Sequence, residues 1–216
     1  MAEKFHAELQ ELKGRVLEMG RLANEMLSKS VEALKDRDME KAEWVISRKD
    51  LLAELDDRIE SDSLRLIALH QPMAENMREI ATALKLNTYL ARVGRYGKDI
   101  AKVAKELAEQ PHLSKLVSIP YQAQIVNGMV ADALKAFETG DLKPLADMVQ
   151  RDSLVDGLRY SIYRECLSYM MEDPKNITRC SHYIMISRYL ERCGDHACKM
   201  SEKVHYMVTG ERIEIK

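Results

Sequence analysis

The sequence contains few aromatic residues, few prolines and no closely spaced cysteine pair. Two Phe, one Trp and five Pro occur among 216 residues, whereas Met occurs thirteen times. We therefore expect a core of aliphatic side chains and Met, with few of the chain breaks that proline imposes. The four cysteines, Cys166, Cys180, Cys193 and Cys198, include no C-x-x-C motif. They are expected to be reduced thiols that pack as small apolar side chains.

Neither a strong net charge nor a long apolar run is present. The formal net charge is −2 at pH 7, so nucleic acid is not an expected partner. Residues 1–16 are charged from the start, which argues against a signal peptide. No apolar run approaches the ~20 residues that a membrane-spanning helix needs. These observations predict a cytoplasmic protein.

Apolar residues recur every three or four positions through most of the chain, as in amphipathic helices. No alternating β pattern extends beyond a few residues, so the predicted fold class is all-α with six long helices. Pro111 and Pro120 bracket the only segment that resembles a linker. The expected helices cover a segment from Phe5, residues 40–69, residues 75–108, a segment up to 139, one that ends at the MEDP motif of 171–174, and residues 175–208.

The two halves of the chain repeat each other at an offset of 100 to 103 residues. RKDLLAELDDRI at 48–59 matches RDSLVDGLRYSI at 151–162, and Gly94 matches Gly194. Such self-similarity indicates a tandem duplication. We therefore predict two domains, 1–110 and 111–216, each a three-helix unit, and two packed bundles in all.

Four carboxylates occur at helical spacing in the second half. Asp152 and Asp156 are four residues apart, as are Glu191 and Asp195, so each pair shares one face of its helix. Antiparallel packing of successive helices could bring the pairs together, and their repulsion would raise their pKa values unless a cation is present. Oxygen ligands favour Mg, Mn, Ca or ferric iron over zinc. Gly194, between the two acids, predicts a close approach of another helix or a ligand.

Two alternatives stand beside the metal site. Acids spaced four apart are common on a chain that is 31% charged, and they can simply be solvated. A metal-dependent hydrolase could use the same four carboxylates to activate water. No nucleophile–base set, glycine-rich phosphate loop or HExxH motif supports an enzyme, however, so we predict a protein without catalytic activity.

The second half carries a motif that is specific to one family. The segments RDSLVDGLRYSIYRECLSYMMEDP and YLERCGDHACKMSEKVHYMVTGE resemble the PhoU family of phosphate-uptake regulators. In the first half, LIALHQPMAENMREIATALKLNTYLARVG resembles the corresponding segment of that family. The resemblance implies two three-helix bundles related by pseudo-twofold symmetry, and a homodimer. It also implies metal bound by the acidic motifs, as iron, manganese, magnesium or zinc, with Asp152, Asp156, Glu191 and Asp195 as ligands here.

The first half departs from the family pattern. Lys49, Ala53, Ala91 and Arg95 stand where acids are expected, and the nearby acids Glu54, Asp56 and Asp57 are out of register. Two methyl groups and two cations cannot replace oxygen ligands, so we expect no metal there. The charges would instead form a structural network or an anion-binding patch, with phosphate at Lys49 and Arg95 as one candidate.

The resemblance also implies a function. Members of the family resemble cytoplasmic adaptors of the high-affinity phosphate ABC transporter. They associate with the membrane indirectly, through the proteins that they bind. They restrain uptake and phosphate-starvation signalling when phosphate is plentiful. The expected partners are the transporter ATPase and a sensor histidine kinase or a transcription regulator. In an alternative hypothesis, the protein is an accessory of a low-affinity phosphate permease.

Overall fold

The fold is entirely helical over the described residues of the computed structural model, 2–113 and 118–215, which contain no strand. This confirms the all-α prediction. No helix within these ranges is both long enough and apolar enough to cross a membrane. The helices are α1 (Ala2–Asp36), α2 (Met39–Ser47), α3 (Lys49–His70), α4 (Ala74–Leu107), α5 (Ser118–Thr139), α6 (Met148–Glu172) and α7 (Ile177–Thr209), with short 3-10 turns at Lys143–Leu145 and Pro174–Asn176.

The helix expected over 40–69 is broken at Arg48 into α2 and α3. The hydroxyl of Ser47 donates a hydrogen bond to the carbonyl of Trp44 (2.8 Å), and the Arg48 N–H donates to the carbonyl of Val45 (3.2 Å). Short serine side chains compete with helical hydrogen bonds in this way. The guanidinium of Arg48 also lies over the Trp44 ring, at 4.7 Å from its centroid. These contacts accompany the break, but the serine bond alone does not end a helix, because the Ser30 hydroxyl makes the same bond to the Leu27 carbonyl within unbroken α1.

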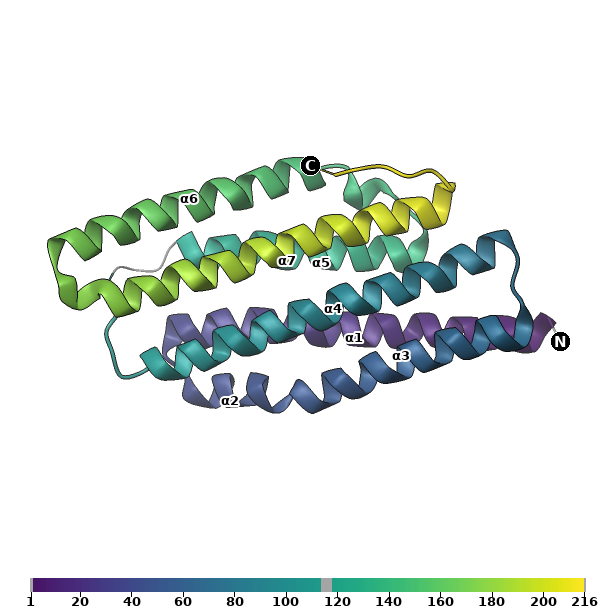
Figure 1. The fold of residues 1–216 in the computed structure, drawn as a ribbon, viewed down its shortest axis with the longest axis horizontal. Helices are drawn as coiled ribbons and strands as arrows, with labels where there is room; N and C mark the ends of the chain where they lie inside the picture. The colour runs from purple at the N-terminus through teal and green to yellow at the C-terminus, as the bar shows by residue number, and fades with distance from the viewer. Residues whose placement is uncertain (1, 114–117, 216) are drawn as a thin grey trace.

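Four long helices form the centre of the molecule (Figure 1). In the first repeat α1 packs against α4, and in the second α5 packs against α7. The repeats join because α4 packs on α7 and α1 packs on α5, which closes a ring of four helices. The outer helices α3 and α6 lie on opposite sides of this ring (Figure 1). The two predicted three-helix units are therefore present, and they share one continuous hydrophobic core. The predicted boundary at 110/111 lies between α4 and α5 and stays a prediction.

Aromatic side chains line the contact between the repeats. The rings of Tyr96 and Tyr189 stack with centroids 5.2 Å apart, and Tyr89 stacks on His196 at 5.6 Å. Burial, the largest effect, lowers the pKa of His196 to about 4, and the charges of Arg92 and Arg192 act in the same direction. His196 is therefore a neutral residue of the interface between α4 and α7.

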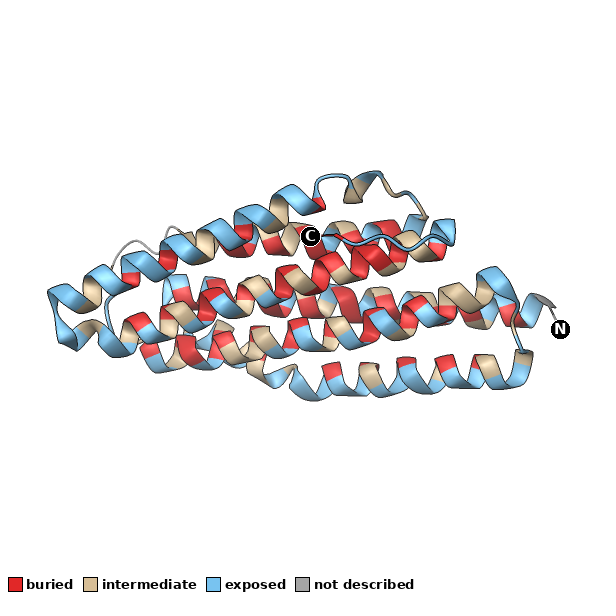
Figure 2. Cartoon of the chain, turned by 45° about the horizontal axis from the view of Figure 1, so that its top comes forward, coloured by how far each residue is buried: buried red, intermediate tan, exposed pale blue. Residues whose placement is uncertain are grey.

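The outer helices bury much less than the central ones (Figure 2). On α6 only four residues are buried: Met148, Val155, Ile162 and Cys166. On α3 the buried residues are Leu52, Leu55, Ile59, Ser63 and Leu66. Each outer helix thus lies on the ring along one narrow row, and the polar residues beside that row reach the edges of the contact.

Among the glycines, the closest approach to the backbone of another helix is at Gly97 of α4. A Cβ atom there would lie 2.9 Å from the backbone nitrogen of Leu27 and 2.9 Å from the carbonyl carbon of Met26, on α1. At Gly194 a Cβ would meet its nearest atoms only at 3.6 Å, an ordinary contact. Helix α6 thus contacts the turn at Gly194 at an ordinary distance, the expected approach of a ligand there stays a prediction, and the backbone contact that only glycine permits lies at Gly97.

We expect Gly97→Ala to destabilise the protein by about 1–3 kcal/mol, because α1 and α4 must separate to admit the methyl group. Chemical denaturation measures the change in the free energy of unfolding. Gly14→Ala is the matched control, since a Cβ at this exposed helical position meets no atom within 4 Å. The control should gain about 0.5–1 kcal/mol from the better helix former. Equal stability of the two variants would contradict the proposed close approach.

Candidate functional site

The four predicted ligands lie on the facing sides of α6 and α7. A Cβ at Gly194 would lie 3.6 Å from Oδ1 of Asp152 and 3.6 Å from Cγ1 of Val155, so α6 lies directly over this turn of α7. Spacings of three, four and seven residues place each row on one helix face. We call the two rows the acidic seam: Asp152, Val155, Asp156 and Arg159 on α6, and Glu191, Gly194, Asp195 and Cys198 on α7.

Burial and neighbouring acids disfavour the charged form of the Asp152 carboxyl group in the acidic seam. Burial is the largest cause that raises its pKa, and the charges of Asp156 and Asp195 raise it further. A hydrogen bond with the Cys198 thiol acts in the opposite direction. Three of the four predicted ligands therefore lie within electrostatic reach of one another, and the ionised form of Asp152 is disfavoured.

Glu191 has a different environment, because arginines surround it. Its side chain is 14% exposed, and the arginine nitrogens lie 3.8 Å (Arg159), 3.6 Å (Arg188) and 3.9 Å (Arg192) from its carboxylate oxygens. Burial and then Asp195 raise the pKa of Glu191, while the arginines lower it. Its Oε2 atom is buried and has no hydrogen-bond partner. Native proteins rarely leave such an atom unsatisfied.

The chemistry of these side chains suits a cation in the acidic seam, but their positions do not form a metal site. The donors are carboxylate oxygens, Asp152 is disfavoured as an anion, and one buried oxygen of Glu191 lacks a partner. Within the described ranges, however, no three His, Cys, Asp or Glu side chains converge closely enough to hold a metal ion. A bound metal would therefore require side-chain rearrangement, above all at Glu191, which would leave its arginines.

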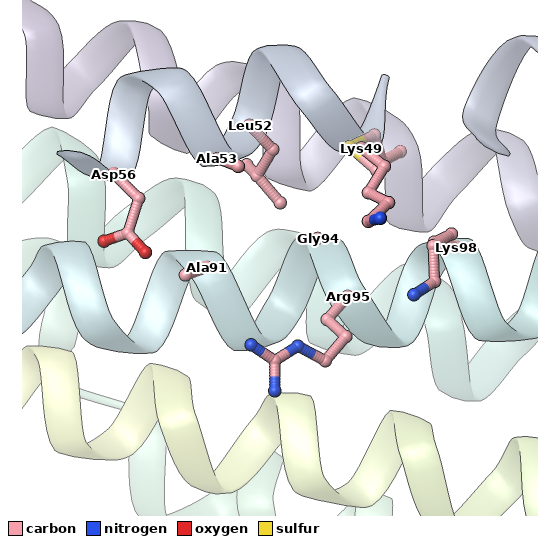
Figure 3. A pocket seen from close by; sticks show the side chains of 9 residues that line it. Lys49, Leu52, Ala53, Asp56, Ala91, Gly94, Arg95 and Lys98 are labelled. Carbon is pink, nitrogen blue, oxygen red and sulfur yellow. The ribbon is translucent and has the colours of Figure 1, made fainter. Parts of the chain in front are cut away.

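The equivalent position in the first repeat is a basic pocket between α3 and α4 (Figure 3). A Cβ at Gly94 would lie 2.5 Å from Cδ2 of Leu52, so the α3 side chain packs more tightly here than the α6 side chains do at Gly194. Lys49 and Arg95 both line this region, where the Lys49 ammonium points from α3 toward α4 and the Arg95 guanidinium points away from α3, toward α7 (Figure 3). The basic pocket is lined by Met26, Lys49, Leu52, Ala53, Asp56, Ala91, Gly94, Arg95 and Lys98. Its donors do not suit a metal ion, as the sequence indicated.

Three residues of the second repeat's site were not singled out from the sequence: Arg159, Arg188 and Arg192. Arg188 is three residues before Glu191, a spacing that brings side chains together on a helix. The contact between Arg188 and Glu191 could therefore have been predicted from the sequence. Arg159 comes from α6, so its approach to Glu191 depends on how the two helices pack.

In the comparison with known proteins, one domain family matches both repeats of the chain. The PhoU domain family matches residues 16–104 and again 121–204, which covers the acidic seam, the basic pocket and most of the chain. The chain belongs to the PhoU family. Its two PhoU domains correspond to the two halves recognised in the sequence, and the resemblance noted there is confirmed.

Similar proteins cover the chain almost end to end. The phosphate-specific transport system accessory protein PhoU homolog of Caulobacter vibrioides is 37% identical over 98% of this chain and 92% of its own length. The Aquifex aeolicus homolog of the same description is 36% identical, over 98% and 96%. The crystal structure of PhoU from Pseudomonas aeruginosa matches with a TM-score of 0.91 at 33% identity, over 96% of this chain and all of its own. The phosphate transport system regulatory protein PhoU from Streptococcus pneumoniae matches with a TM-score of 0.88 at 28% identity, over 97% and 99%.

We expect Asp152→Asn to raise the melting temperature of the metal-free protein at pH 7. Burial raises the pKa of Asp152 above the ordinary value of 3.8, so the folded state holds this proton more tightly than the unfolded chain. Stability therefore falls as pH rises through the raised pKa, and a neutral side chain removes that loss. The difference between variant and parent should shrink as pH falls toward 3.8.

Thermal unfolding in chelator at several pH values provides the measurement. Glu138→Gln, which removes an exposed carboxylate on α5, is the control and should leave the pH profile unchanged. A melting temperature at pH 7 that is lower for Asp152→Asn than for the parent would contradict the interpretation, because it would mean that the ionised carboxylate is stabilised by its neighbours.

Proposed function

We propose that this protein is a non-enzymatic regulator of phosphate transport that acts as an accessory of a phosphate transport system. The observation that carries the proposal is the match of both PhoU domains across nearly the full length of relatives described as phosphate-specific transport system accessory proteins. A related solved structure is described as a phosphate transport system regulatory protein. Alignment over both repeats supports the function of the whole chain rather than of one domain.

The proposed mode of action is that of a cytoplasmic adaptor. In this proposal a homodimer contacts the ATPase of a phosphate ABC transporter and a sensor kinase or transcription regulator, and reaches the membrane through these proteins. A regulator needs two states whose populations a partner can shift. The seams between the outer helices and the central ring are suitable places for such a change, because α3 and α6 bury only one row each.

The acidic seam is proposed to bind a metal ion through Asp152, Asp156, Glu191 and Asp195. Iron, manganese and magnesium suit carboxylate oxygens, and zinc is the less favoured choice. A cation there would offset the repulsion at Asp152 and supply a partner for the buried oxygen of Glu191. The chain's own residues would then hold α6 against α7, a structural rather than a catalytic role.

Deletion of the gene tests the regulatory function. In phosphate-rich medium the deletion strain should take up more phosphate and express its phosphate-starvation genes, because the restraint is lost. Plasmid-borne parent protein should restore both, as should the Gly14→Ala control. Unchanged uptake and expression in the deletion strain would refute the proposed function.

The metal site is tested by elemental analysis of untagged protein. The parent should carry about one or more metal ions per chain, and the combined variant Asp156→Ala, Glu191→Ala, Asp195→Ala should carry none, since three of four donors are removed. Added metal should raise the melting temperature of the parent only, because a ligand that binds the folded state stabilises it. Equal, trace metal in both proteins would mean that the acids form a solvated face.

A further inference from the structure

The two seams carry opposite charge at equivalent positions. On α3 and α6, Lys49 replaces Asp152, and Asp56 stands where the second repeat has Arg159. On α4 and α7, Arg95 replaces Asp195, and Lys98 replaces Cys198. Cations thus replace two of the four acids of the second repeat, Ala53 and Ala91 replace the other two, and an acid stands where the second repeat has a cation. A site with inverted charge suits a ligand of inverted sign.

Two cations of the basic pocket, Lys49 and Arg95, lack a close ionic partner, although Arg95 lies within electrostatic reach of Asp56. The side chains of Lys49 and Arg95 form no ion pair or hydrogen bond with another residue in the described ranges. Lys98, which is 17% exposed, pairs at 3.3 Å with Asp99, a residue outside the lining. Asp56 is the single acid in the lining, and a hydrogen bond of 2.6 Å from the Asn87 amide to its carboxylate holds it.

The position of Asp56 leaves one end of the pocket positive. It is seven residues from Lys49 on α3, and two turns of helix separate their backbones by roughly 10 Å. Figure 3 shows Asp56 at one end, with Lys49 and Lys98 toward the other. Asp56 and Asp99, the partner of Lys98, offset two of the three cations in the lining, which leaves one positive charge in excess. The lining therefore favours an anion.

The size of the pocket limits the ligand. Its volume is about 130 Å³, whereas sites for drug-sized molecules usually span about 300–1,000 Å³. A phosphate group fits this volume, and a whole nucleotide would extend into solvent. The apolar wall formed by Met26, Leu52 and Ala91 lowers the local dielectric constant and strengthens the field of the cations.

We propose that this pocket, between α3 and α4 of the first repeat, is an anion site that binds a phosphate group. The Arg95 side chain would turn toward Lys49 so that its guanidinium fork contacts two phosphate oxygens, and the ammonium groups of Lys49 and Lys98 would supply point charges. The group is free inorganic phosphate or the phosphate of a small molecule such as a nucleotide. The inference depends neither on the metal in the acidic seam nor on the regulatory function, because it concerns other residues.

The test is isothermal titration calorimetry of the full chain, with chelator present, in a low-chloride buffer. Titration with inorganic phosphate should show one saturable site per chain with a Kd at or below ~1 mM, weakened by added salt. The variant Lys49→Ala, Arg95→Ala should lose about tenfold or more in affinity. The control Lys102→Ala, Lys135→Ala removes the same charge outside the pocket and should stay within about twofold of the parent.

A second arm identifies the source of the group. Binding of AMP through the same two residues, at least as tight as that of phosphate, would assign the site to a phosphorylated small molecule. Tighter binding of free phosphate would assign it to inorganic phosphate. Either result supports the proposal.

Three results would overturn the proposal. One is the absence of saturable phosphate binding by the folded parent protein. Another is an equal loss of affinity in the two double variants, which would indicate a general charge effect. The third is saturable binding of an acidic peptide, but not of phosphate, through Lys49 and Arg95, which would make the pocket a protein contact. Circular dichroism of each variant checks that its helices are intact.

Discussion

Burial of four central helices against one another is the constraint on which the rest of the structure depends. The helices α1, α4, α5 and α7 form a closed ring, and their buried residues belong to one continuous core. A fully buried aliphatic side chain contributes about 1.5–3 kcal/mol, so this layer dominates the stability of the fold. The tight crossing at Gly97 sets how closely α1 and α4 approach, and thereby the position of the helix on which the basic pocket is built.

The packing of the outer helices α3 and α6 on the four central helices determines which charged side chains are partly buried. Because α3 and α6 each bury a single row of residues, some positions beside that row, such as Asp56, Asp152 and Arg159, lie half-buried at the edge of the ring. Charges at such positions lose part of their hydration and need opposite charges nearby. Glu191 has three arginines, whereas Asp152 has a thiol and further acids. The same packing therefore produces two seams whose ligand preference depends on a few side chains.

Much of this could be predicted from the sequence, and the failures have clear causes. Apolar spacing indicated the helices, and the internal repeat indicated the two units and their equivalent positions. The break at Arg48 was missed because the sequence on both sides of it is helical in pattern, and the Ser47 hydrogen bond and Trp44–Arg48 contact found there are not visible in that pattern. Gly194 was taken for the close approach because of its place in the motif. The contact lies instead at Gly97, which the sequence does not distinguish from other helical glycines.

The sequence by itself determined the helical class, the duplication, the family and the opposite charges of the two seams. These properties depend on residue identity and on spacing along one helix, which are local. Only the tertiary structure decided that Arg159 reaches Glu191, that the repeats share one core, and that a pocket of about 130 Å³ lies between Lys49 and Arg95. Such contacts join residues that are distant in the chain, and they depend on the rotation and separation of helices, which spacing along one helix does not specify.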